Sequence, residues 1–220
     1  MKKTKIFIAC DTKNVAKVKK IIKLSKAKNI KIGFKFGLEF MNSKNGRNFI
    51  SSLKNKIIFV DLKLNDTVNT MLSAVKALKD LKINYLTVHI SSGLMALKAV
   101  KKVSGSTKIV GVTTVTSLNN KDLKLIGYNK SVKHLVSHQA RLARKAGLDA
   151  LVCSPHEVST VRKIFKKEII TPGVQIGKRN YDQKRSMEAK NVKSDWLVIG
   201  RAITRGNIKK NIQNLSNTLR

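Results

Sequence analysis

Cysteine and proline are both scarce in this chain, with two of each in 220 residues. Two cysteines cannot form a disulfide framework or a closed thiolate metal site. Cys10 and Cys153 lie in short apolar stretches, so we expect buried, reduced thiols. No segment rich in Ser, Gly and Pro interrupts the apolar pattern, and residues 1–220 are therefore predicted to form one domain.

Long hydrophobic runs are also lacking. No apolar run approaches the roughly 20 residues that a membrane-spanning helix needs. The opening MKKTKIFIAC places lysines before an apolar stretch, as export signals do. That stretch runs only from Ile6 to Cys10, shorter than the roughly 7–15 residues of a signal core, and it continues into Asp11 as a strand would. We expect a soluble, cytoplasmic protein with no membrane partner.

Acidic and aromatic residues are few. Twelve Asp and Glu stand against 46 Lys and Arg, which gives a formal net charge of +34, and this predicts first a nucleic-acid-binding protein. However, the excess is mainly lysine spread over nearly every predicted helix, and the 5% of aromatic residues nowhere interleave with a basic stretch as base stacking requires. We therefore expect at most weak, non-specific and salt-sensitive binding of nucleic acid.

What the chain does contain is a regular alternation of two patterns. Eight short runs are almost continuously apolar, which is typical of strands covered on both faces. The predicted strands are residues 5–11, 30–37, 56–63, 85–90, 108–114, 150–154, 168–174 and 196–203. Between them, apolar residues recur every three or four positions, which predicts helices in stretches such as 14–27, 66–81 and 132–147, the last ending at Gly147.

Eight such units in 220 residues predict a compact (β/α)₈ TIM barrel of the α/β class. A doubly wound open sheet is the alternative, but the segment ACDTKN after the first strand has no glycine for a phosphate loop. Active sites of (β/α)₈ barrels lie at the carboxyl ends of the strands. Polar residues at or just beyond the predicted ends are Asp11, Lys35, Asp61, Lys63, His89, Thr114, Thr116, Ser154, Gly200 and Arg201.

The third predicted strand ends in FVDLKLNDTVNT, residues 59–70. Residues two apart on a strand share a face, so Asp61 and Lys63 should both point into the mouth of the barrel. Asp66 follows at a loop or helix start, where it either turns back to the site or reaches a neighbouring subunit. Carboxylates on both sides of Lys63 would favour its charged form, which suits a proton donor and not a Schiff-base former. The alternative is a structural salt bridge with Asp66 as a helix N-cap.

A phosphate site is predicted at the other side of the mouth. TPGV, residues 171–174, opens a segment rich in Gly, Lys, Arg and Asn, and IGRAI, residues 199–203, follows at the eighth strand. The loops after strands seven and eight usually bind phosphate in this fold. Arg201 offers the planar fork that a phosphate favours, and the alternative is an ordinary surface arginine.

Taken in order, FVDLKLNDTVNT, VHISSG, TPGV…DQKR and IGRAI resemble the motifs of the orotidine 5′-phosphate decarboxylase family, over the chain from Asp11 to Arg201. The resemblance implies a homodimeric barrel that converts orotidine 5′-monophosphate to UMP and CO₂, the last step of de novo pyrimidine nucleotide synthesis. It further implies that the enzyme needs neither a metal nor an organic cofactor and that its sites are completed across the dimer interface. The related sugar-phosphate decarboxylases and aldol-type synthases, which use Mg²⁺ and further acidic ligands, are the nearest alternative.

The resemblance also implies individual roles. Asp61 would sit against the substrate carboxylate, and Lys63 would deliver a proton to the pyrimidine carbon. Asp11 and Lys35 would hold the ribose hydroxyls, with Lys35 preferred over Lys31 because KFGLEF resembles the family's Lys-Val-Gly stretch. Asp66 from the other subunit would complete the array of charges. Thr70, also from the other subunit, and Thr116 would contact the nucleotide. The phosphate would be held by Gln183, Gly200 and Arg201.

Two positions depart from the family pattern. Thr67 stands where the family usually has isoleucine, so a hydroxyl replaces an apolar contact between subunits. Gln175 stands where the family often has arginine, which removes one cation from the expected phosphate site while leaving a polar side chain there.

Overall fold

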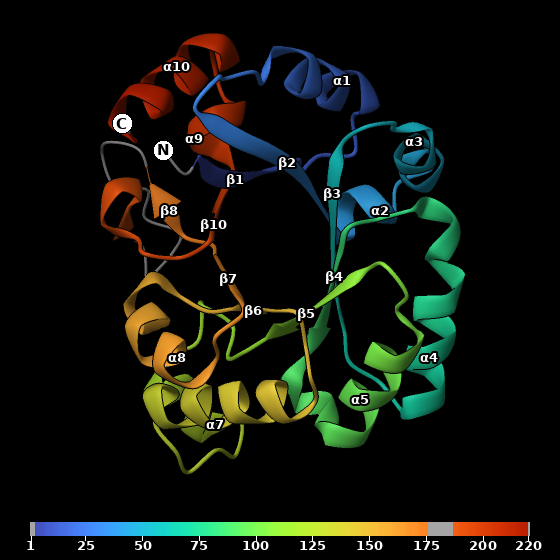
Figure 1. The fold of residues 1–220 in the computed structure, drawn as a ribbon, viewed down its shortest axis with the longest axis vertical. Helices are drawn as coiled ribbons and strands as arrows, with labels where there is room; N and C mark the ends of the chain where they lie inside the picture. The colour runs from blue at the N-terminus through green and yellow to red at the C-terminus, as the bar shows by residue number, and fades with distance from the viewer. Residues whose placement is uncertain (1–2, 176–186, 220) are drawn as a thin grey trace.

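The computed structural model describes residues 3–175 and 187–219. Eight parallel strands close into a barrel in the order β1-β10-β7-β6-β5-β4-β3-β2, and helices surround it (Figure 1). The barrel strands are β1 (Thr4–Ala9), β2 (Ile30–Gly37), β3 (Ile57–Leu64), β4 (Tyr85–His89), β5 (Lys108–Val112), β6 (Ala150–Val152), β7 (Glu168–Thr171) and β10 (Trp196–Ile199). The predicted (β/α)₈ barrel is therefore confirmed, and the open sheet is excluded.

The helices lie outside the barrel and between its strands in sequence (Figure 1). They are α1 (Val15–Leu24), α2 (Leu38–Met41), α3 (Gly46–Ser52), α4 (Val68–Ala77), α5 (Gly93–Val103), α6 (Asn120–Leu125), α7 (Val132–Lys145), α8 (Val158–Ile164), α9 (Arg201–Thr204) and α10 (Ile208–Thr218). Short 3₁₀ turns are η1 (Lys79–Leu81), η2 (Ile90–Ser92), η3 (Pro155–Glu157) and η4 (Ala189–Asn191). As predicted, α7 stops before Gly147, whose φ of +74° suits a residue without a Cβ.

Several predicted strands extend beyond the observed ones, and two of them do so by three residues or more. The run 168–174 breaks after Thr171, because Pro172 cannot donate to the ladder and Gly173 turns the chain with a φ of +76°. Beyond the break, β8 (Val174–Gln175) pairs instead with β9 (Met187–Glu188) in a separate two-stranded sheet. The run 196–203 ends as a strand at Ile199, and Arg201 is the first residue of α9.

The interior of the barrel is filled by aromatic rings. Phe7 stacks on Trp196 with 4.1 Å between ring centroids, and Phe59 and Tyr85 pack against Phe7 at 4.9 and 5.2 Å. All four side chains are buried, as are Cys10 and Cys153, which are not disulfide-bonded, as predicted. Large rings in offset and edge contacts fill the space between converging strands and leave the interior closed below the mouth.

A charged group closes the amino-terminal end of the barrel. The Glu168 carboxylate accepts hydrogen bonds from Lys108 Nζ at 2.9 Å, Lys5 Nζ at 3.1 Å, the Tyr85 hydroxyl at 2.9 Å and Trp196 Nε1 at 3.3 Å. Partial burial alone would raise the pKa of Glu168, but the hydrogen bonds from Lys108, Lys5 and Tyr85 prevail and lower it to about 2. Burial and the neighbouring Glu168 charge raise the pKa of Tyr85 to about 12.

Glu168→Gln should destabilise the fold by about 1–3 kcal/mol at pH 7, because Lys5 and Lys108 lose their carboxylate. The folded pKa of Glu168 lies below the unfolded value of about 4.3, so this contribution is complete above that value and is lost as pH falls toward 2. Urea denaturation of wild type and variant between pH 7 and pH 3 measures the difference. Glu188→Gln, which removes an exposed carboxylate beside Lys190, is the matched control. A difference that stays constant with pH, or that Glu188→Gln reproduces, contradicts the assignment.

Candidate functional site

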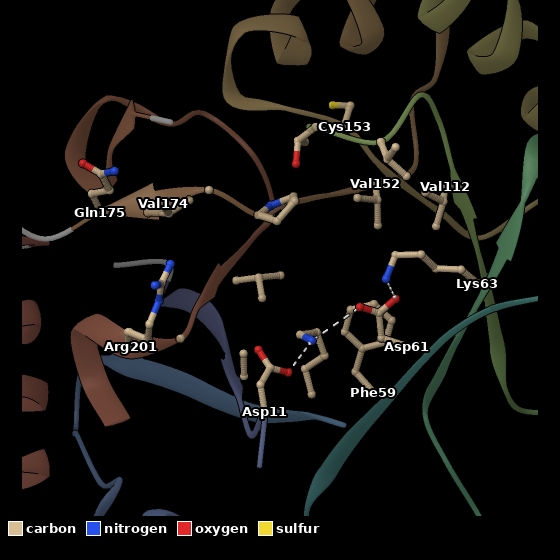
Figure 2. Close-up of a pocket in the computed structure, with 18 of the residues that line it drawn as sticks. Asp11, Phe59, Asp61, Lys63, Val112, Val152, Cys153, Val174, Gln175 and Arg201 are labelled. Atoms are coloured by element: carbon tan, nitrogen blue, oxygen red, sulfur yellow. Dashed lines mark hydrogen bonds and ion pairs between the residues drawn. The ribbon is translucent and has the colours of Figure 1, made fainter. Parts of the chain in front are cut away.

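A cavity of about 330 Å³ opens at the carboxyl ends of the strands, at the mouth of the barrel (Figure 2). Its floor and walls include the apolar side chains Phe59, Val112, Val152 and Val198. The predicted site residues that line it are Asp11, Lys35, Asp61, Lys63, Thr114, Thr116, Gln175, Gly200 and Arg201. Residues from most strands of the barrel thus meet in one pocket, as the (β/α)₈ topology requires.

Four charged side chains form a row across the pocket. Lys35 Nζ lies 3.0 Å from Asp11 Oδ1 and 3.4 Å from Asp61 Oδ2, and Lys63 Nζ lies 2.9 Å from Asp61 Oδ1 (Figure 2). The signs alternate from Asp11 to Lys63, so each charge offsets the desolvation of its neighbour. The side chains of Lys35 and Asp61 in the middle are 11% and 13% exposed, whereas those of Asp11 and Lys63 at the ends are 58% and 37% exposed.

The row fixes the protonation states of its two buried members. Burial alone would lower the pKa of Lys35, but the charges of Asp61 and Asp11 outweigh it and raise the pKa above its ordinary value. Burial alone would raise the pKa of Asp61, but Lys35 and Lys63 outweigh it and lower the pKa. Both groups are therefore charged near neutral pH, and Asp61 presents a fixed negative charge to the pocket.

The backbone at Lys63 departs from a regular strand. The pairing of β3 with β4 shifts between Val60 and Leu64, and Lys63 has a φ of +50°. Its N–H donates to Thr87 Oγ1 at 2.8 Å, and the Thr87 hydroxyl donates to Asp61 Oδ1 at 3.0 Å. The sequence reasoning missed Thr87. The signal that was available is a hydroxyl within the otherwise apolar run YLTVHI.

The structure separates Lys35 from Lys31. Lys31 pairs in register with Lys5 near the amino-terminal end of the barrel and is exposed there. Lys35 pairs with Ala9 at the carboxyl end, and its ammonium reaches the pocket. Of these two lysines, Lys35 is therefore the one that contacts Asp61, and its role in the reaction stays a prediction.

The predicted phosphate residues lie on the other side of the pocket. Figure 2 shows Arg201 and Gln175 opposite Asp61 and Lys63, with the pocket between them. Gly200 immediately precedes α9, so Arg201 enters from the first turn of a helix and not from a strand end. Gln183 lies outside the described residues.

Asp66 and Thr70 do not line the pocket of their own chain. Asp66 Oδ1 accepts the Thr67 N–H at 2.7 Å, and the hydroxyls of Thr67 and Thr70 lie 3.1 Å apart at the start of α4. The N-cap of α4 is Thr67, so the alternative in which Asp66 itself is the N-cap is wrong by one residue. Within the described part of the chain, the ion pairs of Lys63 include Asp61 but not Asp66.

Two further properties concern the described residues alone. No three of their His, Cys, Asp and Glu side chains come together in an arrangement that could hold a metal ion. Among their helices, none has both the length and the apolar character needed to cross a membrane.

The closed eight-stranded barrel with a pocket at the carboxyl ends of its strands places the chain in the class of (β/α)₈ barrel proteins. Residues 4–211 match the model of the Orotidine 5'-phosphate decarboxylase / HUMPS family. The chain therefore belongs to this family.

Relatives support the same conclusion. The orotidine 5′-phosphate decarboxylase of Wolbachia sp. subsp. Brugia malayi is 38% identical over 215 residues, which is 94% of each chain. That of Wolbachia pipientis subsp. Culex pipiens is 42% identical over 183 residues, 79% of this chain and 81% of the relative. Among solved structures, the orotidine 5′-phosphate decarboxylase from Lactobacillus acidophilus matches with a TM-score of 0.83 and 26% identity over 99% of each chain.

Proposed function

We propose that the protein is a carboxy-lyase that converts orotidine 5′-monophosphate to UMP and CO₂ in pyrimidine nucleotide synthesis. The observation that carries the proposal is the row Asp11–Lys35–Asp61–Lys63 in the mouth of the barrel. Full-length similarity to relatives named for this activity supports it.

Decarboxylation requires electrostatic stabilisation at one carbon atom of the pyrimidine ring. When CO₂ departs, the electron pair of the broken C–C bond stays on a pyrimidine carbon that has no adjacent electron sink. A fixed ammonium beside that carbon stabilises the developing charge and can supply the proton that replaces CO₂. Lys63 is assigned this role because its Nζ is held at 2.9 Å from Asp61 while more than a third of its side chain remains open to the pocket.

Asp61 is assigned to the substrate carboxylate. Its pKa is lowered, so it stays charged, and a second carboxylate brought beside it is repelled in the bound substrate. That repulsion ends as CO₂ becomes neutral and leaves, so the interaction favours the transition state over the bound substrate. Lys35 holds Asp61 in place and, with Asp11, faces the part of the pocket assigned to the ribose hydroxyls.

The far side of the pocket is assigned to the phosphate. Arg201 supplies a bidentate donor, and Gly200, Gln175 and Gln183 are the further phosphate residues. Thr116, which lines the same pocket, is assigned to the nucleotide. Binding energy gained at the phosphate, remote from the reacting carbon, can position the pyrimidine ring against Lys63.

We also propose that the enzyme is a cytoplasmic homodimer with composite sites, in which Asp66 and Thr70 reach the partner's pocket. Both residues are exposed and lie away from their own pocket. Met95, which is 79% exposed, is on α5, the neighbour of α4, and an exposed apolar side chain there is suited to a subunit contact. The two buried cysteines, which are not disulfide-bonded, are consistent with a reducing compartment.

The absorbance of orotidine 5′-monophosphate should fall when purified protein is added, and it should fall at the same rate in EDTA. Lys63 already provides the positive charge that a metal ion would provide. Loss of activity with the chelator and recovery with Mg²⁺ would favour the sugar-phosphate branch of the family. Salt-dependent DNA binding without turnover would favour a nucleic-acid-binding protein.

Lys63→Ala and Arg201→Ala should affect different kinetic constants. Lys63 meets charge that exists only in the transition state, so its loss should lower kcat by several orders of magnitude and change KM little. Arg201 grips a phosphate that is charged throughout, so its loss should first raise KM, with about a hundredfold loss in kcat/KM. Lys31→Ala, which removes a lysine from the other end of β2, is the control for charge alone. A near-normal kcat for Lys63→Ala would contradict the proton-donor role and favour a structural salt bridge.

Mixing inactive Lys63→Ala and Asp66→Ala proteins should restore part of the activity. In a mixed dimer, one site carries both substitutions and the other carries neither, so one site is intact. Differently tagged subunits show by co-purification that exchange has occurred. Verified exchange with no recovered activity would refute the shared site.

A further inference from the structure

Lys63 has a backbone conformation that is costly for a residue with a side chain. Its φ of +50° lies in the left-handed region, where the Cβ crowds the following carbonyl oxygen. Among described residues other than glycine, only Asn55 and Lys82 share a positive φ, and both lie outside strands. A strained residue within a strand persists only where its surroundings hold it, and such residues gather at active sites.

The strain coincides with a bulge in β3. Val60 pairs with Leu86 and Leu64 pairs with Val88. Between these two pairs, β3 advances four positions while β4 advances two. The extra length takes the Lys63 N–H out of the regular ladder. Thr87, the β4 residue between Leu86 and Val88, receives that N–H on its side-chain oxygen at 2.8 Å.

The Thr87 hydroxyl has one proton, and that proton goes to Asp61. With the Lys63 N–H occupying a lone pair, the hydroxyl donates to Asp61 Oδ1 at 3.0 Å, the same oxygen that accepts from Lys63 Nζ. Thr87 is 0% exposed, so water does not compete for either bond. One buried hydroxyl therefore links the backbone of Lys63 to the carboxylate that holds its ammonium.

We propose that Thr87 is a positioning residue for decarboxylation: its hydroxyl holds the left-handed bulge at Lys63 and aims Lys63 and Asp61 into the pocket. The inference rests on the proposed function for its catalytic consequence, but the bulge and its hydroxyl are features of the fold. Without the hydroxyl, the Lys63 N–H loses its acceptor and Asp61 Oδ1 loses one of its hydrogen-bond donors, both at a buried position. The Lys63 ammonium is then free to leave the reacting carbon.

Thr87→Val and Thr87→Ser test the catalytic consequence. Valine keeps the shape and removes the hydroxyl, so kcat should fall about 10- to 100-fold, the effect of one hydrogen bond to a charged group, while KM changes less than about threefold. Serine keeps the hydroxyl and should stay within about threefold of wild type. Thr107→Val, which removes a hydroxyl bonded to Ile83 O at the other end of the barrel, is the matched control. Equal kcat values for Thr87→Val and Thr87→Ser would overturn the proposal.

A second comparison does not depend on turnover. In an ordinary strand, glycine is less stable than alanine, but at a positive φ the order reverses. Lys63→Gly should therefore melt at a higher temperature than Lys63→Ala, by a few degrees. A higher melting temperature for Lys63→Ala would contradict the strained backbone at Lys63 on which the inference depends. If wild type fails to consume orotidine 5′-monophosphate, the proposed function fails. The melting comparison still tests whether the backbone at Lys63 is strained.

Discussion

The Asp61 carboxylate, buried between two ammonium groups, is the constraint on which the site depends. A carboxylate that is 13% exposed is tolerable only while Lys35 and Lys63 flank it, and Lys35, which is 11% exposed, depends on the carboxylate in turn. The two strands that carry these groups, β2 and β3, are neighbours, and the segment after β1 adds Asp11 from the other side of β2. The closed barrel supplies what the row requires, which is a set of rigid strand ends that converge on one point.

Much of the fold was predictable because its signals are local. Continuous apolar runs marked all eight barrel strands, and Gly147 marked the end of α7. The largest errors came where a turn interrupts an apolar pattern: Val174 is buried but belongs to β8, beyond the Pro172–Gly173 break, and Ile203 is buried on α9 and not on a strand. Burial is a property that strands and short helices share, so hydrophobicity alone could not divide these runs.

The site was predictable to the extent that polar residues mark the carboxyl ends of apolar strands. Asp61 and Lys63 were expected in the mouth of the barrel and both line the pocket, although Lys63 reaches it through a bulge and not through regular alternation. What no pattern in one chain conveys is a bond between distant residues, such as that from Thr87 to Asp61 across 26 positions. The bulge that brings them together depends on the register of two strands, which is set by tertiary packing.

Many of the few acidic residues are engaged in the pocket, in ion pairs or in helix caps. Asp11 and Asp61 belong to the pocket, while Asp80, Asp149, Glu168 and Asp195 pair with basic side chains. Asp122 completes a capping box at the start of α6. The exposed lysines of α1 have no acidic residue on their own helix to offset them.

The aromatic rings inside the barrel have a consequence for how the enzyme can change. They place an apolar layer between the charged row at the mouth and the Glu168 group at the opposite end. The two ionic networks are thereby held apart in space, and the pKa shifts of Lys35, Asp61 and Glu168 arise from groups of their own network. Folding stability and turnover can therefore be adjusted independently, by substitutions at opposite ends of the same eight strands.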